Sequence, residues 1–299
     1  MQVTRMDLAD TGSPEGLVTA ILRCEKNLPV PVPIEDLCYQ LDIAEIDVLE
    51  TEGFEGGLMT DTARSHGIVL VNKDSRSGRR RFTIGHELGH FLMPSHVPDA
   101  KGRFLCSRKD MALLGAKESD RRAKMEVEAN RFSSLILMPP PLLRPRLTRK
   151  VGPSIESVLD LADEFEVSKQ AMAHAYAKHH QEAVAFVVVQ QGVVRGIYRS
   201  QQRFPFITVR PGQPVPQGSI FHKPRLRQLA PSEIDSRVPD LWIDVERGRA
   251  APRLCEQVCL QANGFAMIML WYEPAEEENE ESDERTARQR WRDNQDRWG

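Results

Sequence analysis

His86-Glu87-Leu88-Gly89-His90 follows the pattern H-E-x-x-H and is the stretch that decides the fold of this 299-residue chain. Residues four apart lie on one face of a helix, so both imidazoles can point at one metal ion. Glu87 lies one position from His86, close enough to reach a water molecule bound to that metal. Two imidazole ligands with a carboxylate base are the layout of a zinc hydrolase. The pentapeptide therefore predicts zinc ligands at His86 and His90 and a general base at Glu87.

The residues around this pentapeptide predict a buried helix beside a small sheet. Gly67–Asn72 is short, apolar and β-branched, as in a strand, and residues 74–81 form a connection rich in Ser, Arg and Gly. Apolar side chains then occupy most positions around the helix: Phe82, Ile84, Leu88, Phe91 and Leu92. A helix that is apolar on nearly all sides is buried, and its few polar groups need partners, which a metal site supplies. Gly85 and Gly89 are poor helix formers, and they indicate the close approach of another element.

A third ligand is expected downstream, because a catalytic zinc needs three protein ligands and one open position. The favoured candidate is Glu126, which lies in a helix predicted for residues 117–138. Asn130 is four residues further along the same face, where its amide can orient a ligand histidine. Glu128 points elsewhere on this helix and is expected to be a solvated charge.

His96 is the competing candidate for the third ligand. It follows His90 by six residues, which is the metzincin spacing. That arrangement uses a glycine to turn the chain under the metal, whereas Met93 and then Pro94 stand at this point. The turn chemistry therefore favours Glu126, and the zinc content of Glu126→Ala and His96→Ala variants would decide between the two.

The remaining N-terminal elements follow from caps, proline positions and periodicity. Helices are expected at residues 14–27 and 34–41, an extended link at 28–33, and a strand at 43–50, with a second strand or a turn at 53–59. Pro139-Pro140-Pro141 is expected to end the helix that carries Glu126, and the basic residues 144–150 to form a solvated connector.

Beyond this point the pattern changes from helical to β-rich. Two helices are predicted at 155–165 and 168–178, and their pairing is compatible with a helix-turn-helix. The second helix carries only Lys169 and Lys178 as firm positive charges, so DNA binding is not favoured. Strands are then predicted at 183–189, 193–198, 206–209, 241–245, 253–260 and 265–272, with Gln190-Gln191-Gly192 as a hairpin signal.

These patterns predict an α+β chain with a zincin-like metallopeptidase core, in which a small sheet lies beside the active-site helix. Four regions are expected: a zinc metallopeptidase domain at 1–150, a helical, helix-turn-helix-like segment at 151–181, a mainly β and sensor-like domain at 182–273, and a charged, disordered tail at 274–299. The small sheet would let an extended peptide add as an edge strand.

Composition narrows the classes of function. The net charge is −3, which gives no general case for a nucleic-acid or membrane surface. No apolar run approaches the roughly 20 residues of a membrane-spanning helix, and residues 1–10 lack the apolar core of a secretory signal. The five cysteines are scattered, which indicates a reducing cytosol. Cys106 lies between the two predicted ligand helices; a buried free cysteine is expected, and an inhibitory cap on the open zinc position is the alternative.

Three linked motifs then carry a resemblance to a known family. They are Arg81-Phe82-Thr83-Ile84-Gly85-His86-Glu87-Leu88-Gly89-His90, Glu126-Val127-Glu128-Ala129-Asn130-Arg131-Phe132 and Leu135-Ile136-Leu137-Met138-Pro139. Together they resemble the ImmA/IrrE family of metallopeptidases over about residues 30–175. Gly85 and Ser133 replace alanines of the family pattern, and the stretch after His90 lacks a histidine common in the family.

The resemblance implies a function as well as a site. It implies zinc held by His86, His90 and Glu126, with Glu87 as the base. It also implies a cytoplasmic endopeptidase that cuts a partner protein, often a helix-turn-helix repressor of a mobile element or a stress regulon. Two alternatives stay open: a non-catalytic, metal-stabilised regulator or ligand sensor, and an enzyme acting on a small peptide or amide. Candidates for stabilising the oxyanion are His66, His96, Tyr39 and the arginines near Arg79.

Overall fold

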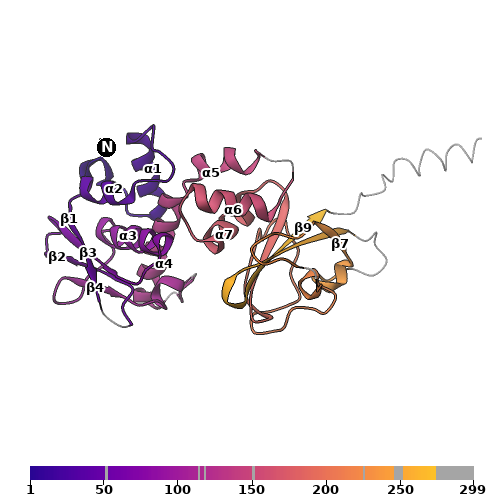
Figure 1. The fold of residues 1–299 in the computed structure, drawn as a ribbon. Coiled ribbons are helices and arrows are strands. Elements are labelled where there is room, and N and C mark those ends of the chain that lie inside the picture. Colours follow the sequence, from indigo (N-terminus) through magenta and orange to yellow (C-terminus); the bar gives the residue numbers. More distant parts are fainter. Residues whose placement is uncertain are drawn as a thin grey trace, which may run out of the picture. The chain divides into compact units, whose positions relative to one another are not determined.

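The computed structural model describes residues 1–50, 53–113, 115–117, 119–149, 152–224, 226–245 and 252–273. The chain divides into two compact units, Met1–Gln181 and Glu182–Gly299 (Figure 1). Each unit contains its own sheet, and the chain is α+β, as predicted. The tail predicted at 274–299 lies outside the described residues. Within the described ranges, no helix is both long and apolar enough to cross a membrane.

The first unit is built on a four-stranded sheet. Its strands are β1 (Ile43–Leu49), β2 (Gly56–Thr60), β3 (Gly67–Asn72) and β4 (Arg103–Cys106), in the order β1-β3-β2-β4. β1 runs parallel to β3, and the other neighbours are antiparallel. The short strand β4 was not predicted; it lies at the edge of the sheet, beside β2.

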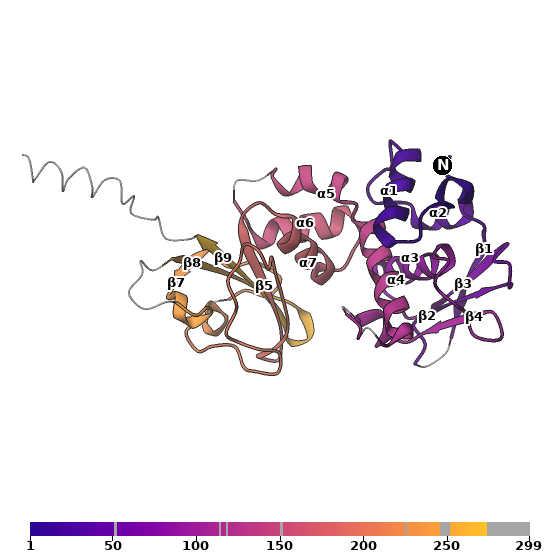
Figure 2. The same cartoon turned by 180° about the vertical axis from the view of Figure 1, so that it is seen from behind.

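Four helices of this unit pack on the sheet or on one another. They are α1 (Pro14–Cys24), α2 (Ile34–Gln40), α3 (Ser77–Leu92) and α4 (Arg121–Leu137), after a short 3-10 turn at Arg5–Leu8. Figure 2 shows α3 between the sheet and α4, and α3 contacts β2, β3 and α4. The predicted connection at 74–81 is wrong in its second half. Three consecutive arginines are good helix formers, and they extend α3 back to Ser77.

The two glycines of α3 mark its contact with α4. A Cβ atom at Gly85 would lie 2.8 Å from the Ser133 Oγ, and one at Gly89 would lie 3.1 Å from the Phe132 Cδ1. The two helices therefore approach too closely for larger side chains at these positions, which confirms the expected close approach of another element.

The last three helices of the first unit are α5 (Pro140–Leu147), α6 (Ile155–Glu164) and α7 (Lys169–His179). α5 corrects the prediction of a solvated connector, since Pro140 stands at the first helical position, where its missing N–H costs nothing. α7 contacts both α5 and α6. Its buried residues are Met172, Ala173, Tyr176 and Ala177. These apolar contacts make α7 a packing element of the unit.

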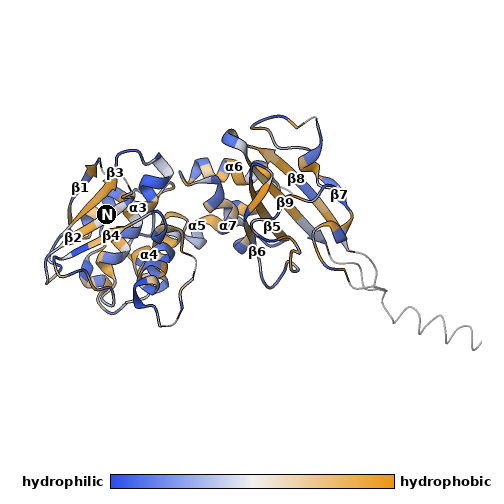
Figure 3. Cartoon of the chain, turned by 90° about the horizontal axis from the view of Figure 1, so that it is seen from below, coloured by the Kyte–Doolittle hydropathy of each residue, from blue (hydrophilic) through white to orange (hydrophobic). Residues whose placement is uncertain are grey.

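The second unit is a five-stranded antiparallel sheet. Its strands are β5 (Ala183–Gln190), β6 (Val193–Arg199), β7 (Asp235–Arg237), β8 (Arg253–Leu260) and β9 (Phe265–Glu273), in the order β6-β5-β9-β8-β7. Gln191 and Gly192 have φ of 51° and 75°, which fits a type I′ hairpin between β5 and β6. Hydrophobic residues run along β5, β8 and β9 (Figure 3).

Two predicted strands of this unit are wrong. Residues 206–209 and 241–245 form no ladder and share one isolated bridge, between Ile207 and Ile243. Both side chains are buried with Trp242 in the core of the sheet. Their apolar character therefore reflects packing rather than strand pairing. Conversely, β7 is a polar edge strand that apolar alternation could not reveal.

Candidate metal centre

Helix α3 brings three functional side chains to one buried point. His86, Glu87 and His90 are each 0% exposed. Glu126 of α4, 4% exposed, faces them. The Nε2 atoms of His86 and His90 lie 3.0 Å apart, and the Glu126 Oε2 lies 3.2 Å and 3.6 Å from them. The two helices thus bring together all four residues that the sequence singled out.

The spacing of these three ligand atoms fits a zinc ion. Zinc bonds of about 2.0–2.1 Å in a tetrahedral site separate nitrogen and oxygen ligands by about 3.4 Å. The observed separations of 3.0, 3.2 and 3.6 Å bracket this value. In the described part of the chain, the buried Glu126 Oε2 has no hydrogen-bond partner. A cation between the three atoms would satisfy it.

Asn130 sets the tautomer of His86. Its Nδ2 donates to the carbonyl oxygens of Asp110, at 3.0 Å, and Leu113, at 3.1 Å. The Asn130 Oδ1 must therefore accept, and the His86 Nδ1, 2.9 Å away, must donate to it. With its proton on Nδ1, His86 keeps the lone pair of Nε2 free for a metal. This is the role expected from the Glu126–Asn130 spacing.

His96 and Glu128 hold His90 in the same way. The Nδ1 atoms of His90 and His96 lie 2.9 Å apart, and the His96 Nε2 lies 2.9 Å from the Glu128 Oε2. Glu128 accepts from His96, so the His96 Nδ1 is free to accept from His90, and the His90 Nε2 again faces the metal position. His96 thus lies behind a ligand rather than beside the metal. Glu128 is a partner of His96, which corrects its expected role as a solvated charge.

Burial and neighbouring charge set the protonation of this centre. Burial lowers the pKa of His90 to about 3, which keeps the imidazole neutral, as a ligand must be. Burial alone would raise the pKa of Glu126, but its contacts with the two histidines hold that pKa below its usual value. Glu126 is therefore an anion facing the neutral His90 imidazole and the Nε2 of His86, a donor set suited to a divalent cation.

Glu87 is the unpaired carboxylate of the site. Neither of its oxygens has a hydrogen-bond partner in the described part of the chain. Burial, and then the neighbouring Glu126 carboxylate, raises the pKa of Glu87 well above its usual value. Gly56 of β2 makes room for it, since a Cβ there would lie 2.9 Å from the Glu87 Oε1 and 2.2 Å from the Thr83 Cγ2. The sequence showed a run of glycines at this point but not the reason for it.

Cys106 stands at the end of β4, beside the metal position. It is 2% exposed, as expected for a buried cysteine, and its Sγ lies 3.8 Å from the His90 Nε2. Ligand-type atoms of His86, Glu87, His90 and Cys106 all lie within 4.8 Å of one another. This group contains Glu87 in place of Glu126. We assign Glu126 to the metal because its oxygen approaches both imidazole nitrogens directly, at 3.2 and 3.6 Å.

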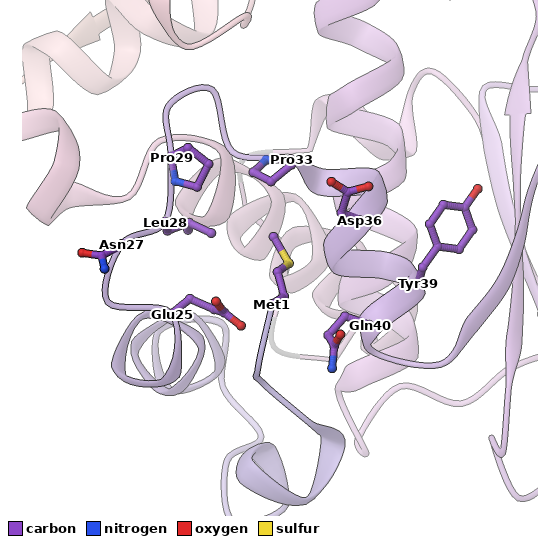
Figure 4. Close-up of a pocket in the computed structure, with 9 residues that line it drawn as sticks. All are labelled: Met1, Glu25, Asn27, Leu28, Pro29, Pro33, Asp36, Tyr39 and Gln40. Carbon is purple, nitrogen blue, oxygen red and sulfur yellow. The ribbon is translucent and has the colours of Figure 1, made fainter.

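Three of the candidates for the oxyanion role have other surroundings. The side chain of His66 is 61% exposed and contacts the Ser65 hydroxyl. Arg79 pairs with Glu55 at 2.6 Å. Tyr39 is half exposed and borders a cavity of about 630 Å³ between the N-terminus, α1 and α2 (Figure 4). That cavity is lined by none of the four predicted site residues.

Comparisons with known proteins find metallopeptidases among the relatives of this chain. Residues 44–176 match the model of the M78 peptidase family, described as the IrrE N-terminal-like domain. The chain is 28% identical over 130 residues to the radiation response metalloprotease IrrE of Deinococcus radiodurans, covering 42% of this chain and 36% of that protein. It is 29% identical over 126 residues to the protein of the same name from Deinococcus deserti, covering 41% and 40%. The chain thus spans about two fifths of the length of these curated relatives.

A solved structure is similar over a longer stretch but more distantly. A Mycobacterium tuberculosis transcriptional regulator aligns with 90% of this chain and 79% of its own, with a TM-score of 0.48 and 13% identity. That likeness carries no argument about function. The family model over residues 44–176 and the two curated relatives, by contrast, confirm the resemblance to IrrE-type metallopeptidases.

Proposed function

We propose that the chain is a zinc-dependent endopeptidase of zincin-like architecture, because residues 44–176 match the model of the IrrE N-terminal-like domain. His86, His90 and Glu126 would hold the zinc, and Glu87 would be the general base. The observation that carries the proposal is Glu87 itself, a fully buried carboxylate without a hydrogen-bond partner among the described residues. A structural metal site has no use for such a group, whereas hydrolysis requires it.

The chain's own residues account for the proton transfers. Bound zinc supplies a Lewis acid that activates water and polarises the scissile carbonyl. Glu87 accepts the proton of the attacking water and passes it to the leaving amine. Its raised pKa favours holding the proton between these two steps. Asn130 and the pair His96–Glu128 keep the two imidazoles in the tautomer that leaves Nε2 free.

The proposed substrate is a partner protein cut within an extended segment. β4 is an edge strand that leads directly to the site, and Leu105 on it is 48% exposed. An extended peptide can pair with such an edge and place a backbone carbonyl near the metal. Following the family resemblance, we propose a helix-turn-helix repressor as this partner, in the cytoplasm. All five cysteines are free, which supports a reducing compartment.

The test uses the full chain with one zinc equivalent and a candidate repressor encoded beside its gene. We expect the repressor to be cut at one peptide bond. Mass spectrometry of the fragments identifies that bond. Glu87→Gln is the matched control, since it keeps the size of the side chain and the three ligands. Cleavage that survives in Glu87→Gln at equal zinc content would overturn the proposal, and so would a wild-type chain that binds no metal.

A further inference from the structure

The zinc site proposed above has a fourth corner, which faces the end of β4. Three corners belong to His86, His90 and Glu126. Zinc–nitrogen and zinc–sulfur bonds of about 2.1 and 2.3 Å place the two atoms of a tetrahedral edge about 3.6 Å apart. The Cys106 Sγ lies 3.8 Å from the His90 Nε2, close to this length. The distance from the sulfur to this ligand nitrogen is therefore the one expected of a fourth ligand.

Other atoms of the site point to the same corner. The ligand-type atom of Cys106 is within 4.8 Å of those of His86, Glu87 and His90. The two Glu87 oxygens are buried and without a hydrogen-bond partner among the described residues, and the Glu126 Oε2 is in the same condition. The thiol therefore lies in a pocket whose polar atoms require a cation rather than in an apolar core.

The backbone holds the thiol in this place. Cys106 is paired with Gly56 across β4 and β2, and its carbonyl oxygen accepts from the Glu55 N–H at 3.2 Å. The Glu55 carboxylate, 4% exposed, pairs with Arg79 of α3 at 2.6 Å and with Arg108 at 3.2 Å. The strand end that carries the sulfur is thus tied to the helix that carries the histidines.

We infer that the Cys106 Sγ is the fourth zinc ligand of the resting protein and closes the site with two nitrogens, one oxygen and one sulfur. The inference rests on the proposed function, because it requires zinc at His86, His90 and Glu126. Four protein ligands are typical of structural zinc, whereas catalytic zinc keeps one position open. Hydrolysis would therefore begin only when the Cys106 thiolate leaves the zinc and takes up a proton, the reverse of the proton loss on binding, so that Cys106 acts as a built-in inhibitor of the peptidase.

Cobalt(II) in place of zinc tests the ligand directly, because a bound thiolate gives sulfur-to-cobalt charge-transfer absorption in the near ultraviolet. We expect this band in the full wild-type chain loaded with one cobalt equivalent. Cys24→Ser, which alters a partly buried cysteine outside the cluster, should keep it. Cys106→Ala and Cys106→Ser should lose it while they retain the visible bands of bound cobalt, which also show that the site has folded.

Activity gives the second readout. With zinc restored, the two Cys106 variants should cut the candidate repressor at least about tenfold faster than the wild type, with Cys24→Ser unchanged. Wild-type protein that binds cobalt without the band, or Cys106→Ala that keeps it, would overturn the inference. The proposed function would still stand in that case if Glu87→Gln abolished cleavage. A wild-type chain without any bound metal would overturn both.

Discussion

Two buried carboxylates, one in each compact unit, have opposite surroundings. Glu256 of β8 is fully buried and accepts hydrogen bonds from the Ser219 hydroxyl and, at 3.4 Å, from the Trp242 Nε1. The Arg237 Nε lies 3.6 Å from it. Glu87 of α3 is equally buried, but its oxygens have no such partners in the described part of the chain.

The difference separates a carboxylate that supports the fold from one that is suited to catalysis. A buried carboxylate costs stability unless hydrogen bonds or an opposite charge compensate it. In the second unit the contacts with Ser219, Trp242 and Arg237 offset part of the burial that raises the pKa of Glu256, so the group is part of the fold. The first unit leaves Glu87 uncompensated in a fully buried position, which is useful only if a metal and a substrate complete the site.

The largest expected effect concerns Glu87. We predict that Glu87→Gln lowers the rate of peptide cleavage by about 10²–10⁴-fold, because the general base is lost. Zinc content should not change, since the three ligands remain. The rate and the bound metal are measured on the same preparation. Loss of zinc together with activity would mean that Glu87 is a ligand instead, and the contrast with Glu256 would then fail.

Glu256→Gln should show the converse result. The amide cannot accept as strongly from Ser219 and Trp242, and Arg237 loses its countercharge. We expect the free energy of unfolding to fall by about 1–3 kcal/mol, measured by urea denaturation. Cleavage by the remaining folded protein should stay at the wild-type rate. A loss of activity at full stability would show that Glu256 acts in the chemistry and would break the comparison.

Asn130→Ala should weaken the metal site without touching the metal. The His86 Nδ1 loses its acceptor, so its tautomer and ring orientation are no longer fixed. We predict about 10–100-fold weaker zinc binding, measured by competition with a chelator. Asn130→Asp keeps an acceptor oxygen for His86 but loses the donations to the carbonyl oxygens of Asp110 and Leu113, so it should recover only part of the affinity. Equal affinity in all three proteins would remove Asn130 from the site.

Local spacing made much of this site predictable. His86, Glu87 and His90 lie within one helical turn, and Asn130 follows Glu126 at the helical spacing of four, so each pair could be placed from periodicity alone. Because a catalytic zinc needs a third protein ligand, the helix of Glu126 could then be predicted to face the helix of the two histidines. This is why the fold of the first unit could be outlined before any contact was known.

The remaining features depend on pairings that periodicity does not encode. The contact between His96 and Glu128 joins positions 32 apart in the sequence. β4 is four residues long, and only its pairing with β2 makes it a strand. Gly56 is required by the approach of a strand to Glu87, which no local pattern reveals. In the second unit, residues 206–209 resemble a strand, but Ile207 fills the core while Phe206 is exposed.

The smallest expected effect is a change in the pH dependence of stability. Because the pKa of Glu87 is raised in the folded state, the folded metal-free chain holds a proton that the unfolded chain has released above about pH 4.5. The free energy of unfolding of the wild type therefore falls as the pH rises above that value. Glu87→Gln removes the loss, so its advantage over the wild type should grow with pH, by at most about 1.4 kcal/mol per pH unit. Urea denaturation of both metal-free proteins at pH 5, 6 and 7 measures the trend. A constant difference would show that the Glu87 carboxyl is compensated in the fold.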